Sequence, residues 1–359
     1  MKKLSKKFKR LLLIIVIILI ITFFLSFLFI FINTRPVSSN SDKKEIIIPS
    51  GSSLYDIANI LKENDIIRNE KFFVYYLKLK KETNIYAAKY VLSSDMKLSE
   101  VVKTLSKGGT NPDEKVITFK EGITIRKVAE IISENTNNTY DEVMKVMTDK
   151  EYIKTLIDKY YFLDEIILSD DIYYPLEGYL YPETYSIKNK DITVQEIIEM
   201  MLNEEERVLS KYKKEINKSS MSIHEILTLA SVVEQEGSTL EDRKTIAGVF
   251  FNRINDGIPL GSDVTAFYGA KIEVSDALNY NGNYNEKNKY NTRETGTVLV
   301  PIGPICNMSS SSIEAVLNPI SSDYYYFVAD KDKKVYFTKT YNEHIKMVDK
   351  LQSEGLWLE

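Results

Sequence analysis

Two glutamates, Glu234 and Glu236, are separated by a single glutamine in the stretch LASVVEQEGS (residues 229–238). A carboxyl group that keeps its proton near neutral pH can act as a general acid, and partial burial raises its pKa in that direction. A position in the last turn of a helix also raises the pKa of a carboxyl group, because the carbonyl end of a helix disfavours negative charge. Composition alone favours a different interpretation, in which both glutamates are solvated surface residues.

The helix that would hold these carboxyl groups is clearly marked. Ser222 and Glu225 fit a capping box, in which each side chain accepts from the backbone N–H of the other. Apolar residues follow at helical spacing, and Gly237 suits the left-handed position just beyond the helix end. Residues two positions apart are roughly 200° apart around a helix, so Glu234 and Glu236 flank the apolar stripe on opposite sides. The spacing predicts different surroundings for them and does not say which one is the acid.

The amino terminus differs from the rest of the chain. Residues 1–10 carry six basic side chains and no acid, and residues 11–32 carry no charge. An apolar run of about 20 residues is long enough for one helix to cross a bilayer, and basic flanks favour the cytoplasmic side. We therefore expect a cytoplasmic basic tail (1–10), a single-pass transmembrane helix in the cell membrane (11–32) and a polar linker (33–44) that lifts the extracytoplasmic remainder off the membrane. A cleaved signal peptide is the alternative.

The composition argues against several kinds of site. The 359 residues have a net charge of −4, and no stripe of lysine and arginine follows the amino terminus, which argues against nucleic acid as a partner. Two histidines and one cysteine argue against a transition-metal site. The cysteine, Cys306, allows no internal disulfide and is expected to be buried as a small apolar side chain. We expect no metal and no cofactor.

An internal repeat follows the linker. Residues 45–64 align with residues 115–135, with their turn glycines in register. Each copy predicts a strand, a glycine turn, a Ser or Thr at a helix start and an amphipathic helix. Residues 95–108 form a weaker third copy. The first copy resembles a LysM-like glycan-binding module, which predicts such a module over residues 45–114; a generic strand–turn–helix unit is the alternative.

Helical periodicity next marks Asp141–Met147 and Val194–Lys211, and between them lies an aromatic stretch, YYPLEGYLYPETYSI, at residues 173–187. Its tyrosines and prolines favour a loop over a helix. Rings on a surface loop would pack against sugar rings, and Tyr also offers a hydroxyl group. Rings that fill a core beneath a long loop are the alternative, and the sequence leaves both open.

Other polar residues are given structural roles or none. His224 is expected on the surface, and Asn252 and Arg253 are expected to tie their helix to neighbouring elements. A lone histidine such as His344 is more often a hydrogen-bonded structural residue than a catalytic one. Trp357, close to the end of the chain, is assigned no role.

Six segments spread over the chain carry further patterns: EGYLYPETY (177–185), DRKTIAGVFFNRINDGIPLGSDVTAFYG (242–269), KYNT (289–292), VPIGPICN (300–307), SSIEAVLNP (311–319) and YYFVADKDKKVYFTKTYNEH (325–344). Together they resemble the YceG-like family of endolytic murein transglycosylases. The order of membrane anchor, LysM-like module and catalytic domain is also that of the family. The resemblance implies an α+β fold, with an α+β catalytic domain over residues 115–359.

The resemblance assigns the catalytic role to one of the two glutamates. In the family's (Val/Ile)-Glu-Lys-Glu pattern the second glutamate is catalytic, and the pattern here reads Val-Glu-Gln-Glu over residues 233–236. The acid is then Glu236, and Glu234 supports the substrate-binding wall. The chain departs from the family at Gly261 and Val264, where an amide and a proline are usual. The other matched motifs imply polar side chains that would hold the sugar, namely Ser262, Asp263, Thr265, Tyr290, Asn291 and Asn307.

The reaction that the resemblance implies cuts the β-1,4 bond between N-acetylmuramic acid and N-acetylglucosamine in nascent peptidoglycan strands and leaves 1,6-anhydro ends. Glu236 would act first as acid and then as base, so no second carboxylate is needed at glycosidase spacing. Glycan strands and the cell membrane are the implied partners, and contact with peptidoglycan synthases and with elongation or division proteins is a family-level expectation. Two alternatives are a hydrolytic muramidase, with Asp263 as the second carboxylate, and a membrane-anchored glycan-binding scaffold with little activity.

Overall fold

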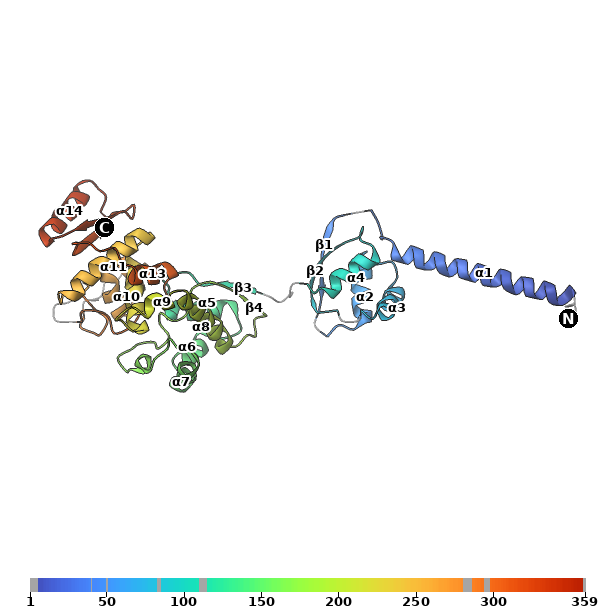
Figure 1. Ribbon diagram of the computed structural model, residues 1–359, viewed down its shortest axis with the longest axis horizontal. Helices are drawn as coiled ribbons and strands as arrows, with labels where there is room; N and C mark the ends of the chain where they lie inside the picture. The colour runs from blue at the N-terminus through green and yellow to red at the C-terminus, as the bar shows by residue number, and fades with distance from the viewer. Residues whose placement is uncertain are drawn as a thin grey trace. The chain divides into compact units, whose positions relative to one another are not determined.

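The computed structural model describes residues 6–39, 41–49, 51–82, 85–109, 115–279, 286–293 and 298–357. The chain divides into two compact units, Met1–Glu114 and Lys115–Glu359 (Figure 1). Each unit combines helices with two-stranded antiparallel sheets, so the fold has the mixed α and β content that the sequence predicts.

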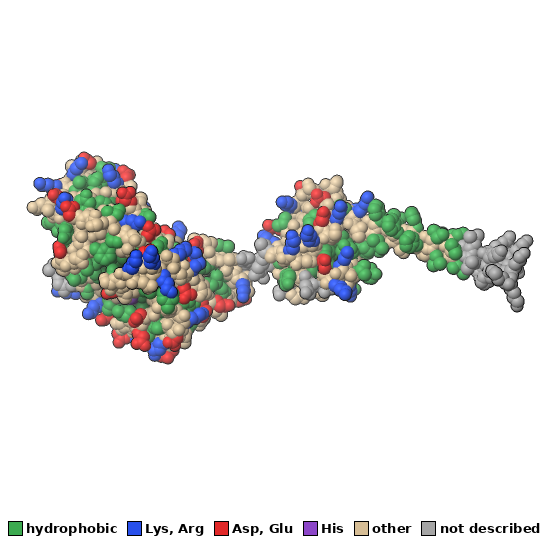
Figure 2. Space-filling model, viewed as in Figure 1, with side chains coloured by type: hydrophobic (Ala, Val, Ile, Leu, Met, Phe, Trp, Pro, Cys, Tyr) green, Lys and Arg blue, Asp and Glu red, His purple; other side chains and the backbone are tan. Residues whose placement is uncertain are grey.

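The first element, α1 (Lys6–Thr34), is a single apolar helix. Its segment Ile14–Thr34 has a mean hydropathy of 3.3 and is not buried within the protein, so the helix is long and apolar enough to cross a membrane. Figure 2 shows hydrophobic side chains over the visible face of the part of α1 that is not drawn in grey. Near its end, Asn33 Nδ2 donates to Phe29 O at 2.8 Å. Such a bond satisfies a polar side chain within its own helix, as a lipid environment requires.

The remainder of the first unit is a two-stranded sheet with three helices. β1 (Lys43–Ile48) pairs antiparallel with β2 (Ala88–Ser93), and Lys43 lies opposite Ser93. Between the strands come α2 (Leu54–Glu63) and α3 (Glu70–Lys80), and α4 (Leu98–Ser106) follows β2. Buried side chains from all five elements form one core.

The segment between α1 and β1 lies in the polar linker that the sequence predicts over residues 33–44, and the structure shows that it is bonded to the first unit. Arg68 donates from Nη2 to the carbonyl groups of Pro36 at 2.6 Å and Val37 at 2.9 Å. Ser38 N donates to Ser94 O at 3.1 Å. These bonds hold the segment against the first unit, so it does not separate the unit from α1.

The second unit begins with strands that are distant in sequence. β3 (Lys115–Thr118) pairs antiparallel with β4 (Thr184–Ile187). The chain between them forms α5 (Ile125–Asn135), α6 (Tyr140–Met147), α7 (Lys150–Lys159) and a short 3₁₀ helix (Glu165–Leu168). After β4 come α8 (Val194–Lys211) and α9 (Lys213–Ile216). α6 and α8 confirm the two helices predicted from periodicity in this region.

Both copies of the predicted strand–turn–helix repeat are present. In the first unit Gly51 has a φ of +82° and the Ser53 side chain caps α2. In the second unit Gly122 has a φ of +80° and the Thr124 side chain caps α5. Glycine reaches a positive φ without steric cost, which explains why each copy turns at a glycine.

The aromatic stretch at residues 173–187 contributes to a core. Tyr179, Tyr181 and Tyr185 are 0%, 9% and 8% exposed. Tyr173 and Tyr174 are partly buried and pack against the same core. Of the two interpretations that the sequence leaves open, the structure supports rings packed beneath a loop.

The rest of the second unit surrounds α10 (Ile223–Glu236), the helix with the two glutamates. α10 begins with the predicted capping box of Ser222 and Glu225. It packs against α11 (Leu240–Asn255), α13 (Ser310–Leu317) and the short α12 (Asp263–Gly269), and a 3₁₀ helix (Val274–Asn279) lies next to α12. The chain continues into an antiparallel pair, β5 (Tyr326–Ala329) and β6 (Val335–Thr338), and α14 (Tyr341–Ser353) packs against both (Figure 1).

Two details of α10 correct the sequence predictions. His224 is buried rather than exposed, because the loop at Ile302 covers this part of the helix: its Nδ1 lies 2.7 Å from Tyr179 Oη and its Nε2 lies 2.7 Å from Ile302 O. Gly237 is not left-handed, since its φ is −108°. A Cβ at this position would lie 2.5 Å from Arg243 Cγ, so close packing explains the glycine.

Candidate active site

Glu236, the last residue of α10, lies at a cleft in the second unit. The cleft has a volume of about 550 Å³. One wall comes from the end of α10 and the turn before α12, and the other comes from β5, α14 and the residues after it. The side chains that line the cleft include Tyr326, His344 and Trp357, together with Arg253 of α11 and Arg293 from the loop after α12.

The surroundings of Glu236 favour its protonated form. Burial raises the pKa of its carboxyl group to about 7, and the negative charge of Asp263 acts in the same direction. Ser262 Oγ donates to Glu236 Oε1 at 2.5 Å, which favours the ionised form and limits the rise. Among the described residues, no group bonds to Oε2, which leaves that oxygen for a ligand in the cleft.

Ser262 is held in place by two threonines. Its backbone N–H donates to Thr292 Oγ1 at 3.2 Å, and its carbonyl group accepts from Thr265 Oγ1 at 2.6 Å. The two threonine hydroxyls are themselves 2.8 Å apart, and both residues are buried. Thr265 therefore acts on the site through Ser262 rather than by facing the cleft.

The departure from the family pattern at Gly261 has a structural reason. Gly261 has a φ of +67°, and a Cβ at this position would lie 3.0 Å from Arg253 Nη2. Glycine thus provides both the turn before Ser262 and the space for the guanidinium group of Arg253. A larger residue at this position requires a different course of the turn.

Glu234 has quite different surroundings from Glu236. Its Oε1 lies 2.6 Å from Arg243 Nη2, and its Oε2 accepts from Ser309 N at 2.9 Å and from Ser312 Oγ at 2.7 Å. The Glu234 side chain is only 5% exposed. Protein groups occupy both oxygens, so Glu234 joins α10 to α11 and to the start of α13 and does not face the cleft.

Asp263 lies at the start of α12, next to Ser262, and lines the cleft. Its carboxylate pairs with Arg293 at 2.8 Å, and both side chains keep substantial exposure, at 57% and 39%. The structure therefore places a second, solvent-accessible carboxylate in the same cleft as Glu236.

The structure does not bring the last three candidate residues to the cleft. Tyr290 is fully buried, and its ring packs between those of Tyr173 and Tyr268, with centroids 4.7 and 4.8 Å away. Asn291 accepts from Arg293 N at 2.9 Å and shapes the turn that carries Arg293. Asn307 Oδ1 accepts from the N–H groups of residues 178 and 180, both at 3.1 Å. These side chains hold together loops that support the site.

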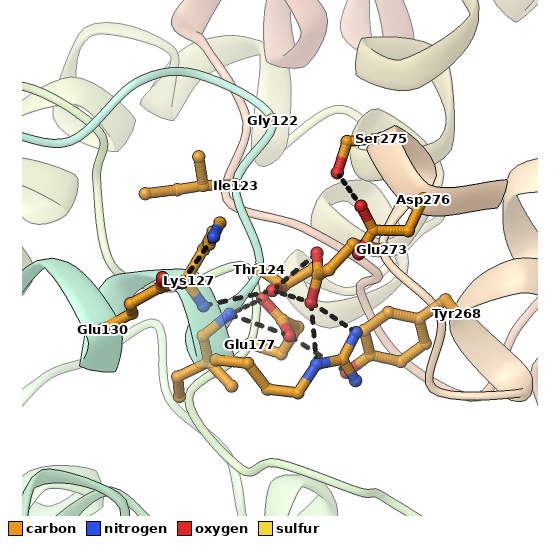
Figure 3. A network of polar contacts seen from close by, with 12 residues as sticks. Gly122, Ile123, Thr124, Lys127, Glu130, Glu177, Tyr268, Glu273, Ser275 and Asp276 are labelled. Atoms are coloured by element: carbon orange, nitrogen blue, oxygen red, sulfur yellow. Dashed lines mark hydrogen bonds and ion pairs between the residues drawn. The ribbon is translucent and has the colours of Figure 1, made fainter. Parts of the chain in front are cut away.

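A second cavity, of about 430 Å³, lies on the other side of the end of α10, next to Gln235. Figure 3 shows the polar network beside it, where Thr124 Oγ1 donates to Glu273. Glu177 is buried there, accepts from Ile125 N at 3.0 Å and accepts from Tyr268 Oη at 3.1 Å. Burial raises the pKa of Glu177 to about 8. Because Glu177 bonds to the first N–H of α5, it fixes the start of that helix.

Several cleft residues were not among the candidates from sequence. Arg293 directly follows the matched KYNT segment, and Tyr326 lies in the matched carboxy-terminal segment, so the only sequence signal for these two residues was that they lie in or beside a matched motif. Arg253 ties its helix to neighbours as predicted, since it donates to Pro259 O at 2.9 Å and to Tyr325 O at 3.0 Å. It also lines the cleft, which its sequence position does not reveal.

Comparisons with known proteins identify the family of the chain. The sequence model of the YceG-like family matches residues 46–350. The chain is 37% identical to the endolytic murein transglycosylase of Bacillus subtilis over 319 residues, which cover 88% of this chain and 87% of that protein. It is 32% identical to the endolytic murein transglycosylase of Streptococcus pneumoniae over 343 residues, which cover 90% of this chain and 61% of that protein.

A solved structure is also similar. The yceG-like protein of Listeria monocytogenes is 35% identical, with a TM-score of 0.60, and the alignment covers 86% of this chain and 100% of that one. Because the family model spans most of the chain and the relatives match along nearly all of it, the chain belongs to the YceG-like family.

Proposed function

We propose that this protein is an endolytic lytic transglycosylase of peptidoglycan, with Glu236 as general acid and then general base. Its relatives are named endolytic murein transglycosylases, which supports the reaction class. The observation that carries the choice of acid is a carboxyl group with a pKa of about 7 at a cleft of about 550 Å³. The bond to be cut is the β-1,4 linkage between N-acetylmuramic acid and N-acetylglucosamine.

In the first step, protonated Glu236 donates its proton to the glycosidic oxygen while the bond from that oxygen to the muramyl anomeric carbon breaks. The hydrogen bond from Ser262 to Oε1 holds the carboxyl group in one orientation and leaves Oε2 for the substrate. The same bond stabilises the carboxylate that forms. The N-acetyl group of the substrate shares the positive charge that develops at the anomeric carbon.

In the second step, the Glu236 carboxylate removes the proton from the 6-hydroxyl group of the muramyl residue, and the hydroxyl oxygen attacks the anomeric carbon. The products are a 1,6-anhydro ring and a free hydroxyl group on the departing sugar, and no water is consumed. Glu236 ends the cycle protonated. A pKa near 7 suits a single group that must both give and take a proton at neutral pH.

The cleft has side chains that could bind a peptidoglycan strand, several of them on the wall formed by β5, α14 and the residues after α14. Tyr326, Tyr341 and Trp357 offer aromatic faces, against which sugar rings pack. Among the described residues, Arg253 has no carboxylate partner, although it is only partly exposed. A partly exposed guanidinium group without a carboxylate partner can bind a carboxylate of the substrate, such as one on a peptide stem.

A hydrolytic muramidase is the second candidate, and Asp263 is the observation that favours it. The charge of Asp263 acts on Glu236, and both residues line the cleft. A second carboxylate in such a position can activate water or stabilise the anomeric carbon. The ion pair between Asp263 and Arg293 favours the first candidate, because it already engages that carboxylate.

We further propose that α1 anchors the protein in the cell membrane, with residues 1–10 in the cytoplasm and both units outside. The length of the apolar segment and its basic flank support this orientation. Residues 45–114 of the first unit are then a LysM-like glycan-binding module, and the two helices between the paired strands β1 and β2 support this role. Peptidoglycan synthases and proteins of cell elongation or division are the partners that this location implies.

Product masses test the reaction. The purified full-length chain is incubated with uncrosslinked glycan strands, and the fragments are weighed. We expect fragments that end in anhydromuramyl residues and are one water lighter than hydrolysis products. Fragments with reducing ends would instead establish the muramidase, and strands that bind but stay intact would favour a scaffold.

The pH dependence tests the state of Glu236. The acid must be protonated in the free enzyme, so kcat/KM is expected to fall as the pH rises above about 7. Ser262→Ala removes the hydrogen bond that lowers the pKa, so this decline should move to higher pH. Ser353→Ala, on the exposed side of α14, serves as the control and should leave the profile unchanged. A shift to lower pH in Ser262→Ala contradicts the assignment.

A further inference from the structure

The first unit contacts α1 through one of its own helices. The ring of Phe72 on α3 packs edge-on against Phe29 of α1, with centroids 5.6 Å apart. The two helices border an open cavity of about 710 Å³, whose walls include Leu25 of α1 and Lys71 and Tyr75 of α3. α3 therefore lies beside residues of α1 that belong to the apolar segment Ile14–Thr34. The bonds that hold the segment after α1 against the unit keep the two helices together.

The position of Phe29 along α1 shows how deep in a membrane this contact would lie. An α-helix rises about 1.5 Å per residue, so Phe29 lies about 7–8 Å from Thr34 along the axis. The 21 residues of Ile14–Thr34 are about 31 Å long, close to the hydrocarbon thickness of a bilayer, about 30 Å. With α1 across the membrane, the Phe72 ring lies in the outermost part of the apolar layer. Helices that lie in the membrane surface bury their apolar side to a depth of about 5–10 Å.

The exposed side of α3 carries the residues that such a position requires. Tyr75 and Leu79 lie one turn apart on this exposed side, whereas Phe72, three residues before Tyr75, is only 8% exposed and packs against Phe29 of α1. Tyr75 and Leu79 are 63% and 65% exposed, which in water leaves two large apolar surfaces without cover. Lys71 and Lys78 are exposed on the same helix. Their ammonium groups can reach lipid phosphates while their carbon chains stay beside apolar groups.

We propose that α3 docks on the outer surface of the membrane, with Tyr75 and Leu79 among the lipid chains and Lys71 and Lys78 at the phosphates. This inference rests on the proposed role of α1 as the membrane anchor. The first unit then lies on the bilayer as a second membrane contact of the protein. A strand bound by this unit is held close to the membrane, where new strands are made.

Depth-dependent quenching tests the docking surface in the full-length protein. Cys306, the only cysteine, is first replaced by Ser, which retains a donor for the Ser231 carbonyl group. Leu79→Cys then carries an environment-sensitive fluorophore. The protein is placed in nanodiscs of phosphatidylglycerol and phosphatidylcholine, in which some lipids have a spin label high or low on the acyl chain. Val91→Cys, an apolar position on β2 that is 51% exposed, is the matched control, and Phe24→Cys reports on α1.

We expect the fluorophore at Leu79 to be quenched several-fold more by the high spin label than by the low one, and the fluorophore at Val91 to be quenched by neither. Leu79→Glu should remove most of the quenching of a fluorophore at Tyr75→Cys, and Val91→Glu should not. A fluorophore at Leu79 that behaves like that at Val91, while that at Phe24 is quenched, overturns the docking surface and leaves the anchor standing. An unquenched fluorophore at Phe24 overturns the anchor and the docking surface together.

Discussion

Glu236→Gln is expected to slow strand cleavage by about 10²–10⁴-fold, the usual contribution of general acid–base catalysis. Glutamine cannot donate the proton to the glycosidic oxygen, and it cannot accept one from the 6-hydroxyl group. The amide has nearly the same size and can still accept a hydrogen bond from Ser262. Binding of uncrosslinked strands should therefore persist, and the loss should appear in kcat rather than in KM. The measurement is the rate of appearance of new strand ends, by mass, for the two proteins side by side.

Glu241→Gln is the matched control, because Glu241 is an exposed glutamate in the first turn of the neighbouring helix, α11. Its cleavage rate should equal that of the unmodified protein. If Glu236→Gln keeps the full rate while forming the same anhydro ends, the acid is another residue and the proposed mechanism fails. If cleavage stops but strand binding is lost as well, Glu236 contributes mainly to the binding of substrate, which contradicts a purely chemical role.

Glu234→Ala is expected to lower the free energy of unfolding of the second unit by about 3–5 kcal/mol, the cost of removing one partner of a buried ion pair. The side chains of Glu234 and Arg243 are only 5% and 12% exposed. Without Glu234, Arg243 is left as a buried charge, and Ser309 N and Ser312 Oγ lose the oxygen to which they donate. Urea unfolding followed by the fluorescence of Trp357, the single tryptophan, reports on this unit.

Glu130→Ala gives the comparison for an exposed pair. Lys127 and Glu130 pair on the surface of α5, with side chains 47% and 45% exposed, and loss of such a pair changes stability by less than about 1 kcal/mol. A double variant with Arg243→Ala should recover part of the loss in Glu234→Ala, because no unpaired charge remains. Equal stabilities of Glu234→Ala and Glu130→Ala would show that the ion pair of Glu234 has no structural role.

Helices and turns that are determined by interactions between residues close in sequence were predicted correctly from the sequence. The capping box at Ser222 and the periodicity of Val194–Lys211 predicted helices that the structure contains. The glycine turns at Gly51 and Gly122 predicted the two strand–turn–helix repeats, and the structure contains both. Caps, turns and periodicity are interactions over a few residues, so a short window of sequence contains all the atoms that decide them.

The sequence also narrowed the site to a few motifs, but periodicity did not separate Glu234 from Glu236. Resemblance to a family made that choice, and the structure shows a physical difference between the two positions. Glu236 Oε2 is left for a ligand at the cleft, whereas Glu234 is enclosed by Arg243 and the start of α13. Residues such as Tyr290 and Asn307 lie in matched motifs yet serve the loops behind the site.

The sequence by itself thus determined the apolar first helix, the positions of several other helices and the motif that contains the two glutamates. The tertiary structure decided which carboxyl group faces a cleft, that His224 is buried, and that the aromatic stretch fills a core. It also decided that α3 packs beside α1. The partners in these contacts come from distant parts of the chain: Ser262 lies 26 residues from Glu236, and Ser309 lies 75 residues from Glu234. The pKa of a carboxyl group depends on burial and on nearby charges in space, and only the folded chain brings those groups together.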